Sequence, residues 1–282
     1  MAALGSAVCR PPRAWQDRAA NPRADAGRRS PGAGARRAGL LDGNPVFWLG
    51  ARRRWRPRLV WMALFAGFML WLWGFLEEGR RWLDEDVYLT TLWCTFAVFK
   101  LWIASASCDR FREDRQEGAL ELLLATPLEY RDFALGQARR LLWQFGWPLG
   151  LVLATVPFMM ADSNDDAIPY YIVGLGMLMA DIWAMHFVGM RLSLTSRKPT
   201  YSGSGVALRI LYLPWMIFFG FILFIFSTVA LLGAPWLPDL SEEFVLGFWF
   251  FVCLGNNLFW AMRAARDLKL NFRQVAAQAA GT

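Results

Sequence analysis

Six apolar runs constrain this chain more than any other feature, because each is long enough to cross about 30 Å of hydrocarbon at about 1.5 Å per residue. In the 282-residue sequence they lie at 59–76, 87–107, 140–161, 168–190, 208–233 and 244–262. Hydrophobic residues make up 56% of the chain and tryptophan occurs 16 times, more than a soluble core of this size uses. The sequence therefore predicts an all-α membrane protein whose six transmembrane helices form one domain over 59–262.

The placement of arginine and lysine tests the six spans independently of hydropathy. The net charge of +7 fits a nucleic acid or a membrane surface, but the basic residues flank the apolar runs, which favours the membrane. Of the 30 basic residues, 27 fall in alternate segments, namely 1–58, 108–140, 191–209 and 263–282. The three intervening loops hold only Arg80 and Arg81, together with 11 carboxylates. Because positive loops resist translocation, we expect both termini to be cytoplasmic, in the plasma (inner) membrane of a bacterium or a similar cell.

The N-terminal region divides into two predicted parts. Residues 1–43 are rich in Arg, Ala, Gly and Pro, cannot bury much apolar area, and are predicted to form a disordered basic tail. They contain no apolar stretch of secretory length, so we expect insertion to begin at the first span. Residues 44–58 are predicted to form an amphipathic interface helix that Pro57 ends. Its apolar face comprises Phe47, Trp48, Ala51 and Trp55. Its basic face comprises Arg52, Arg53 and Arg56. An ordinary positive flank of the first span is the alternative.

The segment 108–139, between the second and third spans, carries the strongest internal pattern. Three leucines share one face of a predicted short helix, with Glu121 pointing away from it: Leu120, Leu123 and Leu124. Next, Thr126 suits an N-cap, Pro127 the first helical position, and Glu129 the third, which together form a capping box. We expect a pair of short cytoplasmic helices whose leucine face binds a partner or lies among lipid headgroups.

Part of this segment, REDRQEGALELLLATPLEYRDFALGQ, resembles the first cytoplasmic loop of ABC-2 type permeases, with its Gly-Thr-Leu-Glu-x-Leu-Leu-x-Thr-Pro-Leu pattern. The chain departs from that pattern at Ala119, where threonine is common, and Arg139 lies later than the lysine often found near the next span. Asn44 and Pro45, with the basic helix after them, also resemble the N-terminal interface helix of the family. The resemblance implies that the loop couples to an ATPase through Glu117, Gly118, Ala119, Leu120, Glu121, Leu124, Thr126 and Pro127.

The resemblance implies a permease subunit of an ABC exporter, which forms the substrate pathway as a homodimer or heterodimer. A separate ATP-binding cassette subunit would bind and hydrolyse ATP. The chain itself has no GxxxxGK[ST] phosphate loop, so we expect no catalysis and no cofactor of its own. Membrane lipids are expected partners and nucleic acid is not. The SGSG at 202–205 lacks lysine and is predicted to be a flexible linker.

Two ionisable residues fall at membrane depth, where charge is costly and suggests function. Lys100 and Asp181 each lie 13 residues past the start of an inward-running span, at about 20 Å depth, and we expect a buried ion pair between them. Its role, packing or transport, stays open, and Lys100 snorkelling to the interface is the alternative. His186 lies about 140° around the helix from Asp181, which predicts an interhelical hydrogen bond and no metal site. The four cysteines are too far apart in sequence to suggest zinc or disulfides.

Other features leave the architecture and the function partly open. Pro148, Pro157 and Pro214 are expected to kink or break their helices, and a re-entrant segment near 235–238 would change the count of spans. Residues 263–282 are predicted to be a cytoplasmic tail. A multi-pass carrier or scaffold unrelated to ABC transporters is the main alternative function. An intramembrane enzyme is the weaker one, because Asp181 and His186 are poorly spaced to act together.

Overall fold

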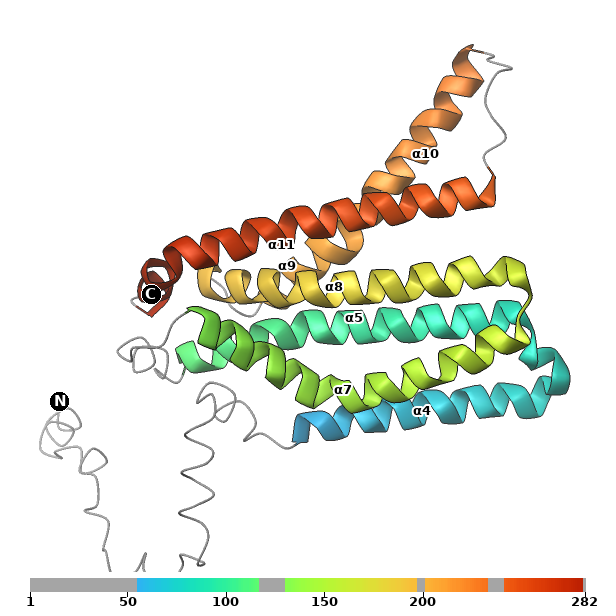
Figure 1. Cartoon of the computed structure of the whole chain (residues 1–282), viewed down its shortest axis with the longest axis horizontal. Coiled ribbons are helices and arrows are strands. Elements are labelled where there is room, and N and C mark those ends of the chain that lie inside the picture. Colours follow the sequence, from blue (N-terminus) through green and yellow to red (C-terminus); the bar gives the residue numbers. More distant parts are fainter. Residues whose placement is uncertain (1–54, 117–129, 197–200, 233–240, 281–282) are drawn as a thin grey trace, which may run out of the picture.

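A computed structural model describes residues 55–116, 130–196, 201–232 and 241–280 (Figure 1). Over these residues the fold is entirely helical. The long helices are α4 (Trp55–Glu78), α5 (Glu85–Gln116), α7 (Tyr130–Asp162), α8 (Ile168–Thr195), α10 (Leu213–Leu232) and α11 (Glu242–Ala280). The short elements are η2 (Gly79–Leu83), η3 (Asp165–Ala167), α9 (Ser202–Ala207) and the π-helical turn η5 (Leu208–Tyr212).

Six helices are long and apolar enough to cross a membrane, which confirms the predicted multi-pass, all-α fold. The predicted tail, most of the interface helix and the loop helices between the second and third spans lie outside the described residues. The last part of the predicted interface helix, 55–58, forms the first turn of α4. Pro57 is tolerated there because the N–H groups of a first turn have no partner within the helix.

Five of the long helices lie side by side, in the order α11, α8, α5, α7 and α4 (Figure 1). α8 packs between α5 and α11, and these three central helices run in the same direction. α4, α7 and α10 run the opposite way. α10 leaves the layer at an angle and contacts mainly α11 and η5. The central three helices therefore form the body of the molecule, and α4 and α10 lie at its margins.

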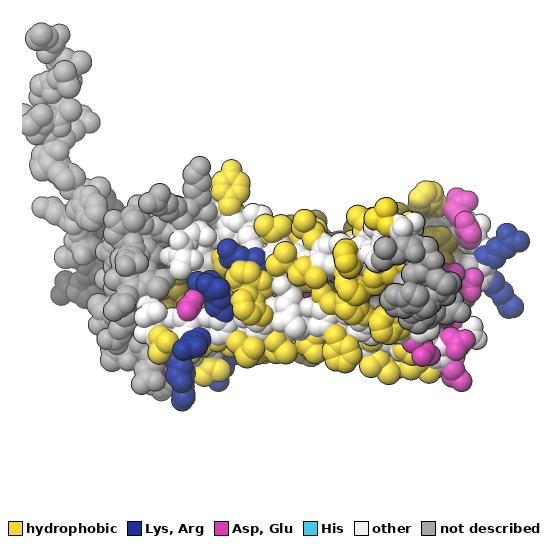
Figure 2. Space-filling view, turned by 90° about the horizontal axis from the view of Figure 1, so that it is seen from above, with side chains coloured by type: hydrophobic (Ala, Val, Ile, Leu, Met, Phe, Trp, Pro, Cys, Tyr) yellow, Lys and Arg dark blue, Asp and Glu magenta, His cyan; other side chains and the backbone are white. Residues whose placement is uncertain are grey.

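The two ends of the bundle differ in charge. We call the end formed by η2, η3 and the start of α11 the acidic end, because most of its charged residues are carboxylates. The opposite end, where α5 and α8 finish and α7 begins, is called the basic end. Figure 2 shows a hydrophobic belt between them, with most of the visible Asp and Glu side chains at one end. This arrangement matches the charge pattern of the sequence.

Local signals explain how the elements at the acidic end begin and stop. Gly79 has φ +61°, a left-handed conformation that favours glycine, and it ends α4 directly after Glu78. The Ser241 hydroxyl accepts a hydrogen bond from the backbone N–H of Phe244 at 3.3 Å, which caps α11. Glu85 accepts bonds from the backbone N–H of Asn164 at 3.2 Å and from its amide at 2.8 Å. The loop after α7 is thereby tied to the start of α5.

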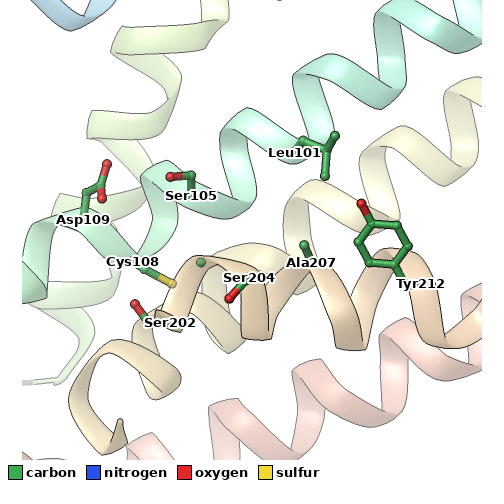
Figure 3. Close-up of a pocket in the computed structure, with 9 residues that line it drawn as sticks. Leu101, Ser105, Cys108, Asp109, Ser202, Ser204, Ala207 and Tyr212 are labelled. Carbon is green, nitrogen blue, oxygen red and sulfur yellow. The ribbon is translucent and has the colours of Figure 1, made fainter. Parts of the chain in front are cut away.

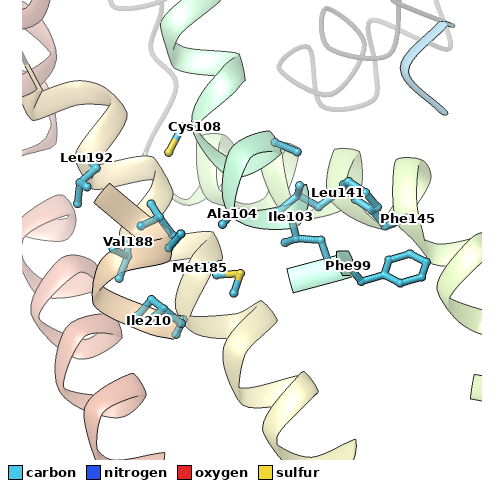
Figure 4. Close-up of a cluster of buried hydrophobic side chains, with 14 of the residues drawn as sticks. Phe99, Ile103, Ala104, Cys108, Leu141, Phe145, Met185, Val188, Leu192 and Ile210 are labelled. Carbon is cyan, nitrogen blue, oxygen red and sulfur yellow. The ribbon is translucent and has the colours of Figure 1, made fainter. Parts of the chain in front are cut away.

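The central core depends on close contact between α5 and α8. Small residues of α5, among them Ala104 and Ser107, face α8 near Gly189, and the Cys108 thiol donates to the Gly189 carbonyl at 3.6 Å. A methyl group on Gly189 would overlap the Ser107 side chain. Figure 4 shows the apolar cluster around this contact, to which α7 and η5 also contribute. Small residues at helix crossings are a main source of association energy in membranes, since lipid offers no hydrophobic force between helices.

One sequence prediction differs from the structure, and a second segment has a conformation that the sequence left open. The SGSG segment is helical, not a flexible linker: it forms α9, and a Cβ on Gly203 would lie 3.2 Å from the Cα of Ser105. Glycine here allows the backbones of α9 and α5 to approach closely. The predicted C-terminal tail, 263–282, is helical as far as Ala280 and continues α11, and its cytoplasmic location stays a prediction. Both segments lack apolar runs, which is why hydropathy places them outside the spans.

Replacing Gly189 by alanine tests the α5–α8 contact. We expect Gly189→Ala to lower the stability of the purified protein by about 1–3 kcal/mol, since the new methyl group must displace Ser107. Thermal unfolding in detergent measures the change. Gly150→Ala is the control, because a Cβ there meets nothing within 4 Å. The double variant Gly189→Ala/Ser107→Gly should regain part of the loss, and equal melting of all variants would contradict the close contact.

Candidate functional site

The residues predicted to couple to an ATPase, Glu117 to Pro127, all lie outside the described residues. The structure does describe the two helices on which this segment is mounted. α5 extends to Gln116 and α7 begins at Tyr130, so much of the predicted 108–139 loop continues the flanking helices. The 13 residues 117–129 connect these two helix ends at the basic end.

The helix ends around this segment are fixed to each other by specific contacts. The Gln137 amide donates to the backbone carbonyl of Ser107 at 2.6 Å, which joins α7 to α5. The Phe133 and Phe272 rings lie 4.8 Å apart between centroids and join α7 to α11. Both phenylalanines are almost fully buried. The part of α11 beyond the sixth predicted span therefore braces the start of α7, a role that the sequence did not indicate.

Lys100 and Asp181 are in contact inside the membrane-spanning region. The Lys100 Nζ lies 2.7 Å from Asp181 Oδ2, and the Asp181 side chain is only 3% exposed. The side-chain amide of Asn257 donates a second hydrogen bond to the other oxygen of Asp181. Both oxygens of the carboxylate thus have a partner, as a buried charge requires. The site joins α5, α8 and α11 through one residue from each.

The three residues also lie at the same depth. Lys100 and Asn257 are each 15 residues past the first residue of their helices, Glu85 and Glu242, and Asp181 is 13 residues past Ile168. At about 1.5 Å per residue these positions are about 20–22 Å from the acidic end. Asn257 was not identified from the sequence, because an asparagine in an apolar run, here the second of two, carries no signal of what it faces. The one indication of a shared site was that Asn257 lies as far past the start of its helix as Lys100 does past the start of its own.

His186 does not take part in this site. It is buried, its ring lies 4.8 Å from the Phe187 ring between centroids, and its Nδ1 has no hydrogen-bond partner among the described residues. The predicted interhelical hydrogen bond is therefore not made at that atom. In the described part of the chain, no three His, Cys, Asp or Glu side chains gather closely enough to hold a metal ion. Asp181 is engaged by Lys100 and Asn257 instead.

A second polar arrangement lies where α10 leaves the bundle. In the π-helical turn η5 the Leu208 carbonyl accepts from the N–H of Leu213, so the next carbonyl, of Arg209, faces Pro214, which has no N–H. The Asn256 amide of α11 donates to that carbonyl at 2.8 Å. The guanidinium of Arg209 lies 5.0 Å from the ring centroid of Trp260, one turn further along α11. The helix is distorted before Pro214 but not broken, since η5 passes directly into α10, and α11 supplies the donor that the proline lacks.

Two hollows accompany these elements. A cavity of about 300 Å³ lies between α5 and α9, and Figure 3 shows Ser105, Ser202 and Asp109 among its polar lining. A larger groove of about 1140 Å³ separates α4 from α5 and α7 and is almost entirely apolar. Neither hollow contains the Lys100–Asp181 pair. The groove continues the lipid-facing surface of α4, most of which is exposed.

Comparison with known proteins gives no match: no family model, no curated protein and no solved structure is similar to this chain.

The ion pair predicts a specific pattern of rescue. Lys100→Met should destabilise the protein by about 3 kcal/mol, because it leaves the Asp181 carboxylate buried without its counter-charge, and Lys100→Met/Asp181→Leu should recover most of that loss. The exchange Lys100→Asp/Asp181→Lys should melt well above Lys100→Asp alone.

Thermal unfolding and gel filtration in detergent provide the measurements. Arg80→Asp, a charge reversal at an exposed position of the acidic end, should leave both unchanged. If the single and double variants at Lys100 and Asp181 unfolded at the same temperature, the two charges would not stabilise each other.

Proposed function

We propose that this chain is the membrane subunit of an ATP-driven exporter of the ABC-2 type, which forms the substrate pathway and is coupled to a separate ATP-binding subunit. Coupling would occur through 117–129 at the cytoplasmic side of the membrane. The six apolar helices and the charge difference between the two ends support this proposal. The pattern in 117–129 supports it independently of the topology.

The main observation behind the proposal is the length of α5 and α7, the two helices that 117–129 connects. α5 has 32 residues and α7 has 33, lengths of about 48 and 50 Å, against about 30 Å of hydrocarbon. Their ends near η2 and η3 are tied together at the acidic end, so the excess length projects at the basic end. A short segment held on two projecting helices suits the docking of a protein beneath the membrane.

The contacts behind the segment support transmission of force from such a partner. A displacement of 117–129 would reach α7 and α5 together, because Gln137 links them at 2.6 Å. It would also reach α11 through Phe133 and Phe272. Further along α5, Lys100 connects to α8 by the ion pair with Asp181. ATP binding by a partner could thus move the whole central layer, which is what an exporter requires.

A pathway between two copies agrees with the uneven burial of the helices. In the most apolar part of each span, 6% of residues are buried for 58–83 and 17% for 202–231, against 22% for 242–272 and 44% for 165–195. The margins of the layer are therefore the surfaces left for lipid or for a second subunit. We infer that the substrate passes between copies and not through one bundle, whose centre is filled by the cluster around Ile103 and Met185.

Purification with the partner tests the function. Chromatography of the protein from native membranes should yield a stoichiometric ATPase subunit. Leu120→Asp or Leu124→Asp should reduce its recovery at least about tenfold, because a charge on the predicted leucine face costs more than about 1.4 kcal/mol of binding.

Leu122→Asp is the matched control, since the helical spacing puts Leu122 about 200° from Leu120 and Leu124. All three variants should retain the melting temperature of the unmodified protein. Transport at full rate by the purified chain without any ATPase would contradict the proposal and favour a carrier of another class.

A further inference from the structure

Three arginines from different elements converge at the basic end, on the side of the layer where α10 departs. They are Arg191 of α8, Arg209 of η5 and Arg263 of α11. On α11, Arg263 lies one turn after Trp260, whose ring is 5.0 Å from the Arg209 guanidinium, and one turn before Asp267, which pairs with Arg191, so the contacts of α11 bring the three arginines to one region. Such convergence is unfavourable unless negative charge lies among them.

The protein supplies only part of that negative charge. Asp267 of α11 pairs with Arg191 at 2.8 Å. Within the described residues, neither Arg209 nor Arg263 has a carboxylate within 4 Å, and the cluster retains an excess of two positive charges. α11 contacts Arg209 at two places: the ring of Trp260 lies against its guanidinium, and the amide of Asn256 donates to its backbone carbonyl. The partly exposed guanidinium of Arg209 is thus positioned against α11.

The depth of the cluster agrees with the headgroup region of a bilayer. Arg191 lies 23 residues past Ile168, and Arg263 lies 21 residues past Glu242. These spacings correspond to about 34 and 31 Å from the acidic end, close to the full thickness of the hydrocarbon. The Lys100–Asp181 pair is about 10 Å deeper. A phosphate at the membrane boundary would therefore meet the arginines and not the ion pair.

Exposed apolar residues lie next to the arginines along η5 and α11. Leu208 is 56% exposed, Phe259 is 53% exposed and Met262 is 58% exposed, and each adjoins Arg209, Trp260 or Arg263 in sequence. A ligand with a phosphate and hydrocarbon chains would satisfy both kinds of surface. Inorganic phosphate would satisfy only the arginines.

We propose that Arg209, Arg263 and Arg191 form a binding site for the phosphate of an anionic phospholipid, whose acyl chains lie against Leu208, Phe259 and Met262. Charge-assisted hydrogen bonds from guanidinium to phosphate are strong, and basic clusters between membrane helices are suited to acidic headgroups. The site bridges α8, η5 and α11 at the point where α10 leaves the bundle. The proposal does not depend on an ATPase partner.

Lipid binding by the full chain tests the site. The purified protein in detergent would be titrated with phosphatidylglycerol or phosphatidylcholine, and affinity would be read from the rise in melting temperature and from retained lipid in native mass spectrometry. Phosphatidylglycerol should bind and phosphatidylcholine should not. Arg209→Gln and Arg263→Gln should each weaken phosphatidylglycerol binding about fivefold. Arg263 is exposed, so its variant tests the site even if Arg209→Gln fails to fold.

Two controls carry the same change of charge outside the cluster: Arg80→Gln at the acidic end and Arg139→Gln on the exposed face of α7. Both should bind phosphatidylglycerol like the unmodified protein. Equal weakening by all four variants, or equal binding of the two lipids, would overturn the proposal. Inorganic phosphate at millimolar concentration would be titrated in the same way as the two lipids. If it gave the same stabilisation as the lipid, the ligand would be a free anion and the lipid site would be refuted.

Discussion

The contact between Lys100 and Asp181 is the constraint to which the central layer must conform. A lone charge at this depth would cost several kcal/mol, so each residue restricts where the helix of the other can lie. Asn257 adds α11 to this restriction by donating to the second carboxylate oxygen. Because all three residues are at about the same distance from the acidic end, the pairing also fixes the relative register of three parallel helices. A shift of one helix by a turn, about 5.4 Å, would separate the charges.

The register set by the ion pair allows the close contacts on either side of it. Toward the basic end, Gly189 of α8 meets Ser107 of α5, and Gln137 of α7 reaches the carbonyl of Ser107. Toward the acidic end, Tyr170 of α8 donates to Glu242 of α11 at 3.1 Å. These contacts need the helices at one height and at short separation. α10 makes no comparable polar contact along its described length beyond η5, and it diverges from the layer (Figure 1).

The sequence was sufficient to predict the elements but not the contacts that position them. Length, hydropathy and the alternation of charge identified six helices, because each of these signals reports directly on the membrane. The Lys100–Asp181 pairing followed from depth alone, since few partners exist for a charge in an apolar run. Asn256 and Asn257 gave no such signal, because asparagine is neutral and its partners come from distant segments. The helix at 202–207 was missed for a related reason: glycine and serine disfavour an isolated helix, and only the packing of α9 on α5 makes it stable.

Under the proposed function, these contacts restrict the kind of motion that an ATPase could drive. A push on 117–129 cannot slide α7 alone, because Gln137 and Phe133 bind it to α5 and α11. It cannot slide α5 alone either, because the buried ion pair would break. The central layer must then tilt as one rigid body, and the flexible points must lie at its margins. η5 is one joint of this kind, since Pro214 removes a backbone hydrogen bond there and a side chain of α11 replaces it. We therefore expect the substrate pathway to open and close by movement between the layer and α10, or between two copies of the layer.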